Sequence, residues 1–195
     1  MKNVVIISLV ILANAAMFLA ACNEEEQKES TSYVPTKEEL RKRGEYLVGV
    51  IGCDDCHTPK VMGPNGPELV LERRLSGHPM DVPVSKVDTS VLSDWMYFRH
   101  DLTAAVGPWG VSFAANLTSD ETGIGNWSEA QFFKAIREGK SKGMDDTRPL
   151  LPPMPWFVYK NMSNEDLRAI FTFLKSTKPV HNIVPKPLSV AEVAE

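Results

Sequence analysis

Five consecutive residues, Cys53-Asp54-Asp55-Cys56-His57, constrain this chain more than any other stretch. The chain has three cysteines and four histidines among 195 residues, and a random arrangement of them would contain Cys-x-x-Cys-His in about one sequence in a thousand. Two thiols three residues apart lie on one face of a helical turn. Each thiol can add to one vinyl group of a haem, and the histidine that follows can then bind the iron. The spacing therefore predicts a helical turn that carries one covalently bound haem c.

Three other uses of the cysteine pair are left open by the residues themselves. A disulfide between Cys53 and Cys56 would close a very short loop and stabilise the protein little. A thioredoxin-like redox pair, which would make the protein a thiol oxidoreductase, normally stands in a β-α-β pattern that the neighbouring residues lack. A zinc site would need a second cysteine pair or a spaced pair of histidines. Haem attachment is the interpretation that the pattern favours.

A second iron ligand decides whether such a haem carries electrons or binds small molecules. Met154 is the favoured candidate because four prolines, within residues 149–155, fix the backbone around it and lower the entropy lost when the loop is ordered. Trp156 can cover the haem edge from the same loop. We therefore predict Met154 as the distal ligand, with a haem enzyme or gas sensor that has an open distal side as the alternative. His78 and His100 are fallback ligands, whereas His181 lies among prolines near the end of the chain and suggests a wrapping tail.

The third cysteine lies at the end of an apolar segment near the start of the chain. Residues 4–21 follow the single positive Lys2, and Leu19-Ala20-Ala21 leads directly to Cys22. This layout is typical of a signal peptide and resembles the lipobox of bacterial lipoproteins, which implies lipid attachment at Cys22. A retained membrane helix is the alternative. We predict a signal peptide over residues 1–21, an acidic flexible tether over 22–35, and an extracytoplasmic domain anchored to a bacterial membrane.

The net charge and the length of the chain limit its possible partners and the number of its domains. The chain has 21 basic and 25 acidic side chains, and a formal net charge of −4. Nucleic-acid binding needs concentrated positive charge, so we expect no nucleic-acid partner. A length of 195 residues allows one domain with appendages.

Helical patterns indicate the scaffold of that domain. Three segments, 36–51, 128–139 and 163–175, combine a capping residue with apolar side chains spaced three and four residues apart. Gly44 lies inside the first segment, where a close crossing with segment 163–175 would explain a residue that disfavours helix. Residues 60–112 show no clean period and are interpreted as an inserted segment. We predict an all-α fold over residues 36–183, with long loops and a C-terminal tail over 184–195.

Together these motifs resemble class I cytochrome c domains, most closely those of the multi-haem cytochrome subunits of membrane-bound alcohol, aldehyde and gluconate dehydrogenases. The resemblance implies Cys53 and Cys56 as thioether positions, His57 as proximal ligand and Met154 as distal ligand. It also implies that Asn116 helps line the haem cleft. The further motifs are Gly44-Glu45-Tyr46-Leu47, residues 116–120, Thr122-Gly123-Ile124-Gly125-x-Trp127-Ser128, residues 151–156 and the helix from Glu165.

The expected function is single-electron transfer without substrate chemistry. The expected partners are redox proteins, either a dehydrogenase or a terminal oxidase, and a membrane reached through the lipid anchor. The chain could be a free carrier or a subunit of a larger complex.

Overall fold

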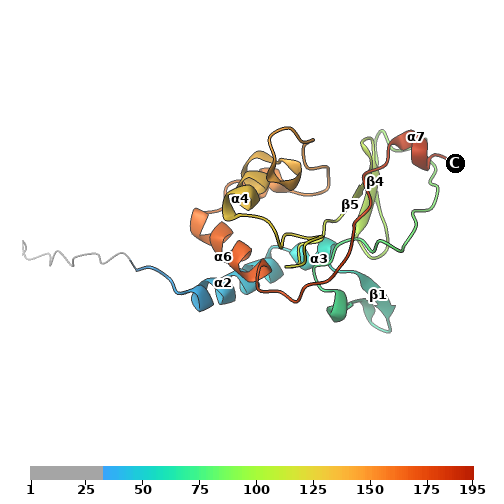
Figure 1. Cartoon of the computed structure of the whole chain (residues 1–195). Helices are drawn as coiled ribbons and strands as arrows, with labels where there is room; N and C mark the ends of the chain where they lie inside the picture. The colour runs from blue at the N-terminus through green and yellow to red at the C-terminus, as the bar shows by residue number, and fades with distance from the viewer. Residues whose placement is uncertain (1–32) are drawn as a thin grey trace, which may run out of the picture. The chain divides into compact units, whose positions relative to one another are not determined.

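Three long helices form the frame of the domain (Figure 1). The computed structural model describes residues 33–195, so the predicted signal peptide, Cys22 and most of the predicted tether lie outside the described residues. At the start of each helix, the side chain of a Thr or Ser accepts the backbone N–H of the residue three positions later, as helix caps do. All three predicted helical segments are thereby confirmed. The helices are α2 (Lys37–Val50), α4 (Glu129–Glu138) and α6 (Asn164–Leu174).

Helices α2 and α6 cross at Gly44, as its position inside an apolar helix face predicts. A Cβ atom at Gly44 would lie 2.8 Å from Cβ of Phe173 and would overlap the backbone oxygen of Ala169. Only glycine therefore permits this approach of the two backbones. The same crossing is bridged at the surface by an ion pair of 2.9 Å between Arg43 and Asp166.

The prediction of an all-α fold is wrong, because the residues between α3 (Cys53–His57) and α4 form two antiparallel sheets. Strands β1 (Lys60–Gly63) and β2 (Gly66–Leu69) make a hairpin in which Lys60 pairs with Leu69. The second sheet has the strand order β3-β4-β5. Its strands are β3 (Tyr97–Phe98), β4 (Ala104–Gly107) and β5 (Gly110–Phe113).

These strands escape sequence analysis for a physical reason. Strands β4 and β5 are short and are buried on almost all their residues, so they lack the alternation of apolar and polar side chains that marks a half-buried strand. Strand β3 has two residues, and both are exposed. It pairs with β4 over only two residues, too few to give a strand pattern in the sequence.

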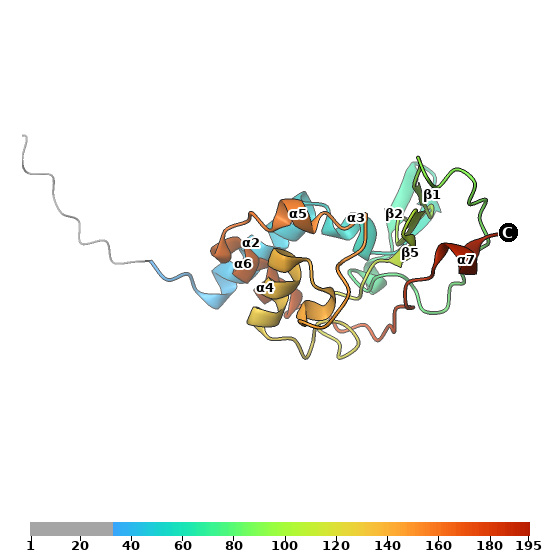
Figure 2. The same cartoon turned by 90° about the horizontal axis from the view of Figure 1, so that it is seen from above.

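Helix α3 lies between the long helices and the larger sheet, as Figures 1 and 2 both show. Among residues 33–195, no helix is both long enough and apolar enough to cross a membrane. The other short helical elements are η1 (Leu71–Arg73), η2 (Ser141–Gly143), α5 (Trp156–Tyr159) and α7 (Val190–Val193).

Two separate clusters of buried apolar side chains stabilise the domain. The helical core gathers side chains from α2, α4 and α6 with two from the connecting loops. Its members are Leu47, Val48, Leu75, Ile124, Phe132, Leu167, Ala169, Ile170, Phe171, Phe173 and Leu174. The sheet core joins the larger sheet to α7 and to the loop before β3. Its members are Leu92, Ala104, Val106, Val111 and Val193.

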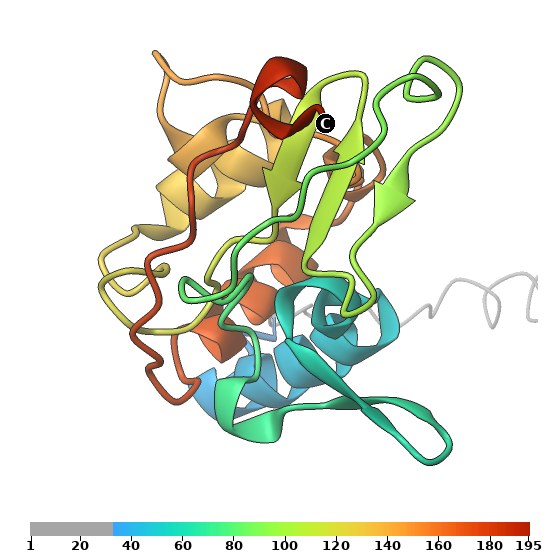
Figure 3. The ribbon, with the colours of Figure 1, turned by 90° about the vertical axis from the view of Figure 1, so that its right-hand side faces the viewer.

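The last twenty residues, 176–195, form an extended C-terminal strap that ends in α7 (Figure 3). Leu188 pairs with Val111 of β5 through two backbone hydrogen bonds of 2.8 and 3.1 Å. Val193 of α7 is 2% exposed and belongs to the sheet core. The segment predicted as a C-terminal tail, 184–195, thus packs along the larger sheet.

Candidate haem site

Cys53 and Cys56 lie on α3, and both are half-buried free thiols. Burial raises the pKa of Cys53 to about 12, with further contributions from the charges of Asp54, Cys56 and Asp55. Burial also raises the pKa of Cys56. A redox-active thiol needs a lowered pKa, so these two cysteines do not have the environment of a thiol oxidoreductase.

His57 ends α3, and its Nδ1 atom lies 2.7 Å from the backbone oxygen of Ala115. A carbonyl oxygen can only accept, so Nδ1 carries the proton and Nε2 keeps a free lone pair. Burial lowers the pKa of His57, although the hydrogen bond to Ala115 opposes this effect. The neutral imidazole with a free Nε2 is the form that binds a metal.

Asp54 anchors α3 to the inserted segment. Its carboxylate accepts a hydrogen bond of 2.8 Å from Nη2 of Arg74 and one of 2.7 Å from Oγ1 of Thr58. The Thr58 oxygen in turn accepts the backbone N–H of Leu75 at 2.9 Å. Burial would raise the pKa of Asp54, but the hydrogen bonds from Arg74 and Thr58 outweigh it and leave the pKa below its ordinary value.

The loop that holds Met154 is fixed on both sides. Ser112 of β5 donates a hydrogen bond of 2.5 Å to the backbone oxygen of Pro152, and the Pro152–Pro153 peptide bond is cis. Trp156 packs on Gly139, where an added Cβ would overlap the indole ring and the backbone has a positive φ of 65°. The loop that carries the half-buried Met154 is therefore braced by Ser112 and by the packing of Trp156.

Tyr159 places α5 beside the cysteine motif. Its hydroxyl donates a hydrogen bond of 2.7 Å to the backbone oxygen of Ile51, two residues before Cys53. Burial raises the pKa of Tyr159, and the neighbouring Cys53 and Cys56 contribute to the rise. Helix α5, which follows Met154 in the chain, thus contacts the C-terminal end of α2, two residues before the cysteine motif.

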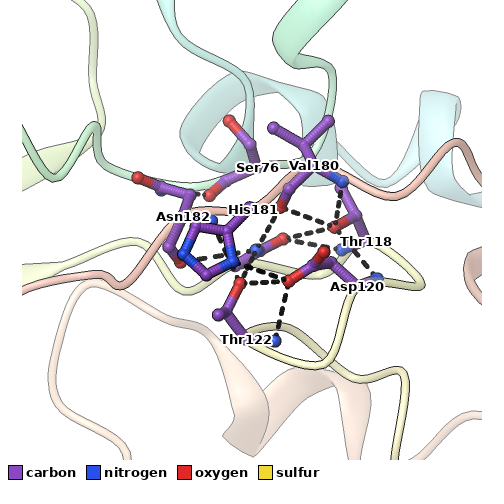
Figure 4. Close-up of polar contacts among 8 residues, drawn as sticks. Ser76, Thr118, Asp120, Thr122, Val180, His181 and Asn182 are labelled. Atoms are coloured by element: carbon purple, nitrogen blue, oxygen red, sulfur yellow. Dashed lines mark hydrogen bonds and ion pairs between the residues drawn. The ribbon is translucent and has the colours of Figure 1, made fainter.

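Asn116, which the resemblance assigns to the haem cleft, makes its hydrogen bonds with the C-terminal strap and with the loop that follows Asn116 itself. Its Nδ2 atom donates to the backbone oxygen of Val180 at 2.9 Å and to Oγ1 of Thr122 at 3.1 Å, and its Oδ1 atom accepts from Oγ1 of Thr118 at 2.7 Å. Figure 4 shows Thr118, Thr122, Val180 and Asn182 in this network. Asn116 lies next to Ala115, so the network also holds the residue that contacts His57.

The fallback ligands His78 and His100, and the third candidate His181, lie in other surroundings. Both ring nitrogens of buried His78 have protein partners, Oγ1 of Thr103 at 2.8 Å and the backbone oxygen of Val82 at 3.2 Å. His181 is an exposed side chain 3.7 Å from the carboxylate of Asp120 (Figure 4). His100 is exposed.

The donor set fits a haem c. Two thiols on one helical turn, a neutral imidazole with its Nε2 free and a thioether on a braced loop are the groups that covalent attachment and His/Met ligation require. The contacts that sequence analysis missed are those of Ala115, Ser112 and Tyr159. Ser112 and Tyr159 have polar side chains, which is a weak indication that they form hydrogen bonds. Ala115 acts through its backbone, so its residue type indicates nothing.

No protein-family model matches the chain. Several curated proteins are similar to it in sequence. The chain is 30% identical over 158 residues to the gluconate 2-dehydrogenase cytochrome c subunit of Pantoea cypripedii, covering 77% of this chain and 27% of the relative. It is 28% identical over 145 residues to the cytochrome c subunit of the quinone alcohol dehydrogenase of Gluconobacter oxydans, covering 73% and 23%.

A shorter match has higher identity. The chain is 40% identical over 79 residues to a nicotinate dehydrogenase subunit from Pseudomonas putida, which covers 40% of this chain and 6% of the relative. The chain thus spans about a quarter of the length of the two cytochrome subunits and far less of this third relative.

The site and these relatives together define a cytochrome c domain. That domain resembles the cytochrome c subunits of gluconate, alcohol and fructose dehydrogenases, and the relatives imply haem c as its cofactor.

Proposed function

We propose that this protein is a lipid-anchored cytochrome with one covalent haem c that carries single electrons between a dehydrogenase and an acceptor. The observation that carries the proposal is the position of His57 directly after two half-buried thiols, with Nδ1 held by Ala115 and Nε2 free. The names of the relatives, all subunits of dehydrogenases, support the same function.

Each residue of the site has a role in this proposal. Cys53 and Cys56 hold the haem through thioether bonds, and His57 and Met154 bind the iron from opposite sides. When bound, haem c supplies reversible one-electron chemistry. A thioether ligand favours ferrous iron and so raises the reduction potential. The chain contains one Cys-x-x-Cys-His motif, which corresponds to one haem.

Haem attachment is tested by the alkaline pyridine spectrum of the purified protein. We expect the absorption of haem c, and we expect it to survive extraction with acidified acetone because the thioether bonds are covalent. A matched variant, Cys53→Ala and Cys56→Ala together, should release the haem into the extract. Purified protein without haem absorption would contradict the proposal.

Carbon monoxide tests the distal ligand. The reduced protein should resist carbon monoxide if Met154 fills the second axial position, and Met154→Ala should bind it fast and tightly. Met162, which packs against the helical core, gives the control Met162→Ala, which should remain resistant. Rapid binding by the unaltered protein would favour a haem enzyme or gas sensor instead.

The electrostatics of the chain predict the character of its partner. A formal net charge of −4, one unit more negative after removal of Lys2 with the leader, favours a donor or acceptor with a basic patch. Reduction by such a partner should slow as ionic strength rises. Co-purification of a dehydrogenase from detergent-solubilised membranes would distinguish a complex subunit from a free carrier.

Lipid attachment is tested by the mass of the mature protein. Acylation at Cys22 predicts an N-terminal peptide that begins at this residue and carries acyl chains, and partition into the detergent phase. Cys22→Ser should abolish both, while the haem spectrum stays unchanged.

A further inference from the structure

The carbonyl oxygen that accepts from His57 belongs to a segment 58 residues further along the chain. That segment, 114–117, is joined to segment 75–78 by two backbone hydrogen bonds of 2.8 and 2.9 Å. Gly77 also donates its backbone N–H to the backbone oxygen of His57 at 2.7 Å. Segment 75–78 therefore contacts both partners of the hydrogen bond between His57 and Ala115.

Gly77 is the residue on which this arrangement depends sterically. A Cβ atom there would lie 2.6 Å from the backbone oxygen of Ala115 and would also overlap the oxygen of Ala114. The backbone at Gly77 has a positive φ of 77°, which side chains disfavour. Any larger residue would displace the very carbonyl group that accepts from Nδ1 of His57.

Asn182 braces segment 75–78 from the C-terminal strap (Figure 4). Its side chain is fully buried, and Nδ2 donates to the backbone oxygens of Ser76 and His78 at 2.7 and 2.8 Å. Its Oδ1 atom accepts the backbone N–H of Met80 at 2.9 Å. The three hydrogen bonds fix the backbone on both sides of Gly77.

The hydrogen bond at Nδ1 affects the iron through the imidazole ring. A histidine that donates its second N–H to an acceptor becomes a more basic ligand. A more basic ligand stabilises ferric iron relative to ferrous iron and lowers the reduction potential. Displacement of the Ala115 carbonyl should therefore raise the potential.

We propose that Gly77 and Asn182 are positioning residues that maintain the hydrogen bond between His57 and Ala115 and thereby keep the reduction potential low. This inference rests on the proposed function, because it requires iron bound at His57. It assigns a role to the inserted segment 60–112, through segment 75–78, and to the C-terminal strap.

Redox titration of the haem-loaded, full-length protein tests the role of Gly77. Gly77→Ala should change the equilibrium constant with a fixed mediator about tenfold toward the reduced form, which corresponds to about 59 mV for one electron. The matched control is Gly66→Ala, because Gly66 also has a positive φ, of 120°, but nothing lies within 4 Å of its added Cβ. The control should leave the potential unchanged.

A second pair of variants keeps the test decisive if Gly77→Ala fails to fold. Asn182→Ala should raise the potential in the same direction by a smaller amount. Ser76→Ala is its control, because the buried hydroxyl of Ser76 has no hydrogen-bond partner. The Nδ1 proton of His57, followed by NMR in the reduced protein, should exchange faster with solvent in Gly77→Ala and Asn182→Ala than in their controls.

Two outcomes contradict the inference and can be told apart. Haem-loaded Asn182→Ala with unchanged potential and unchanged proton exchange would show that the bracing does not reach His57, and the proposed function would stand. A protein without haem c in the pyridine spectrum would overturn the proposed function, and the inference with it.

Discussion

The helical core and the sheet core are built in different ways. The helical core uses helices of 10 to 14 residues, each with its own cap and its own apolar face. The sheet core uses strands of two to four residues, which are stabilised by a strap from the far end of the chain. The comparison shows that local sequence patterns predict the long helices, which have their own caps and apolar faces. The short strands depend on tertiary contacts with the strap and have no such pattern.

Both cores contribute to the candidate haem site. Ser112 of the sheet holds Pro152, and Tyr159 binds Ile51 at the end of α2. The loop with Met154 is therefore fixed between the two regions. A destabilising substitution in either core should shift the loop that carries Met154. A substitution in the helical core should also lower the free energy of unfolding of the domain more strongly.

The largest expected effect comes from the crossing of α2 and α6. Gly44→Val should lower the free energy of unfolding of the ferric protein by about 4 kcal/mol, because the new side chain overlaps the backbone of Ala169. Gly49 is the control on the same helix, since a Cβ there meets nothing within 4 Å. Gly49→Ala should stabilise the protein by up to about 1 kcal/mol. Urea denaturation measures both, and a mild loss in Gly44→Val would mean that the helices can separate without cost.

Shortening one buried side chain in each core compares how much the two cores contribute to stability. Leu174→Ala in the helical core should cost about 3 kcal/mol, and Val193→Ala in the sheet core about 2 kcal/mol. Both side chains are nearly inaccessible, at 1% and 2% exposure, so the difference reflects the size of the side chain removed. Hydrogen exchange should then show whether the strap opens before the helices. Equal protection of both regions in Val193→Ala would indicate that the two cores unfold as one unit.

The smallest effect concerns the ion pair between α3 and the inserted segment. Arg74→Met should lower the free energy of unfolding by about 1 kcal/mol at pH 7, because a third of the Arg74 side chain is exposed and solvent weakens the ion pair. The pKa of Asp54 is lower in the folded protein than its ordinary value, so its contribution is present above about pH 4 and is lost as the pH falls through the folded value.

The difference between Arg74→Met and the unaltered protein should accordingly shrink in acid, which denaturation curves at pH 7 and pH 3 can measure. Arg41→Met is the control, because Arg41 is about equally exposed but pairs with the exposed Glu38 and Glu45. A pH-independent difference for Arg74→Met would mean that the stacking of Arg74 over Phe173, at 5.5 Å, accounts for its contribution instead.

The sequence was sufficient to predict the features that depend only on residue type and spacing. Thr36 and Glu39 form the capping box that their spacing predicts, and Gly44 lies at the predicted crossing. It failed for β4 and β5, whose burial on both faces removes the alternating pattern. It could not find the role of Ala115, because a backbone carbonyl is the same in every residue and its position depends on the whole fold.

The contact between α2 and α6 also bears on the order of events during synthesis. Arg43 and Asp166 pair across 123 residues, and the two helices share most of the helical core. Contacts between such distant residues form only after the intervening chain is available, so the domain cannot close until α6 has been made. Until then the segment with Cys53 and Cys56 lacks its packing partners, and both thiols are accessible.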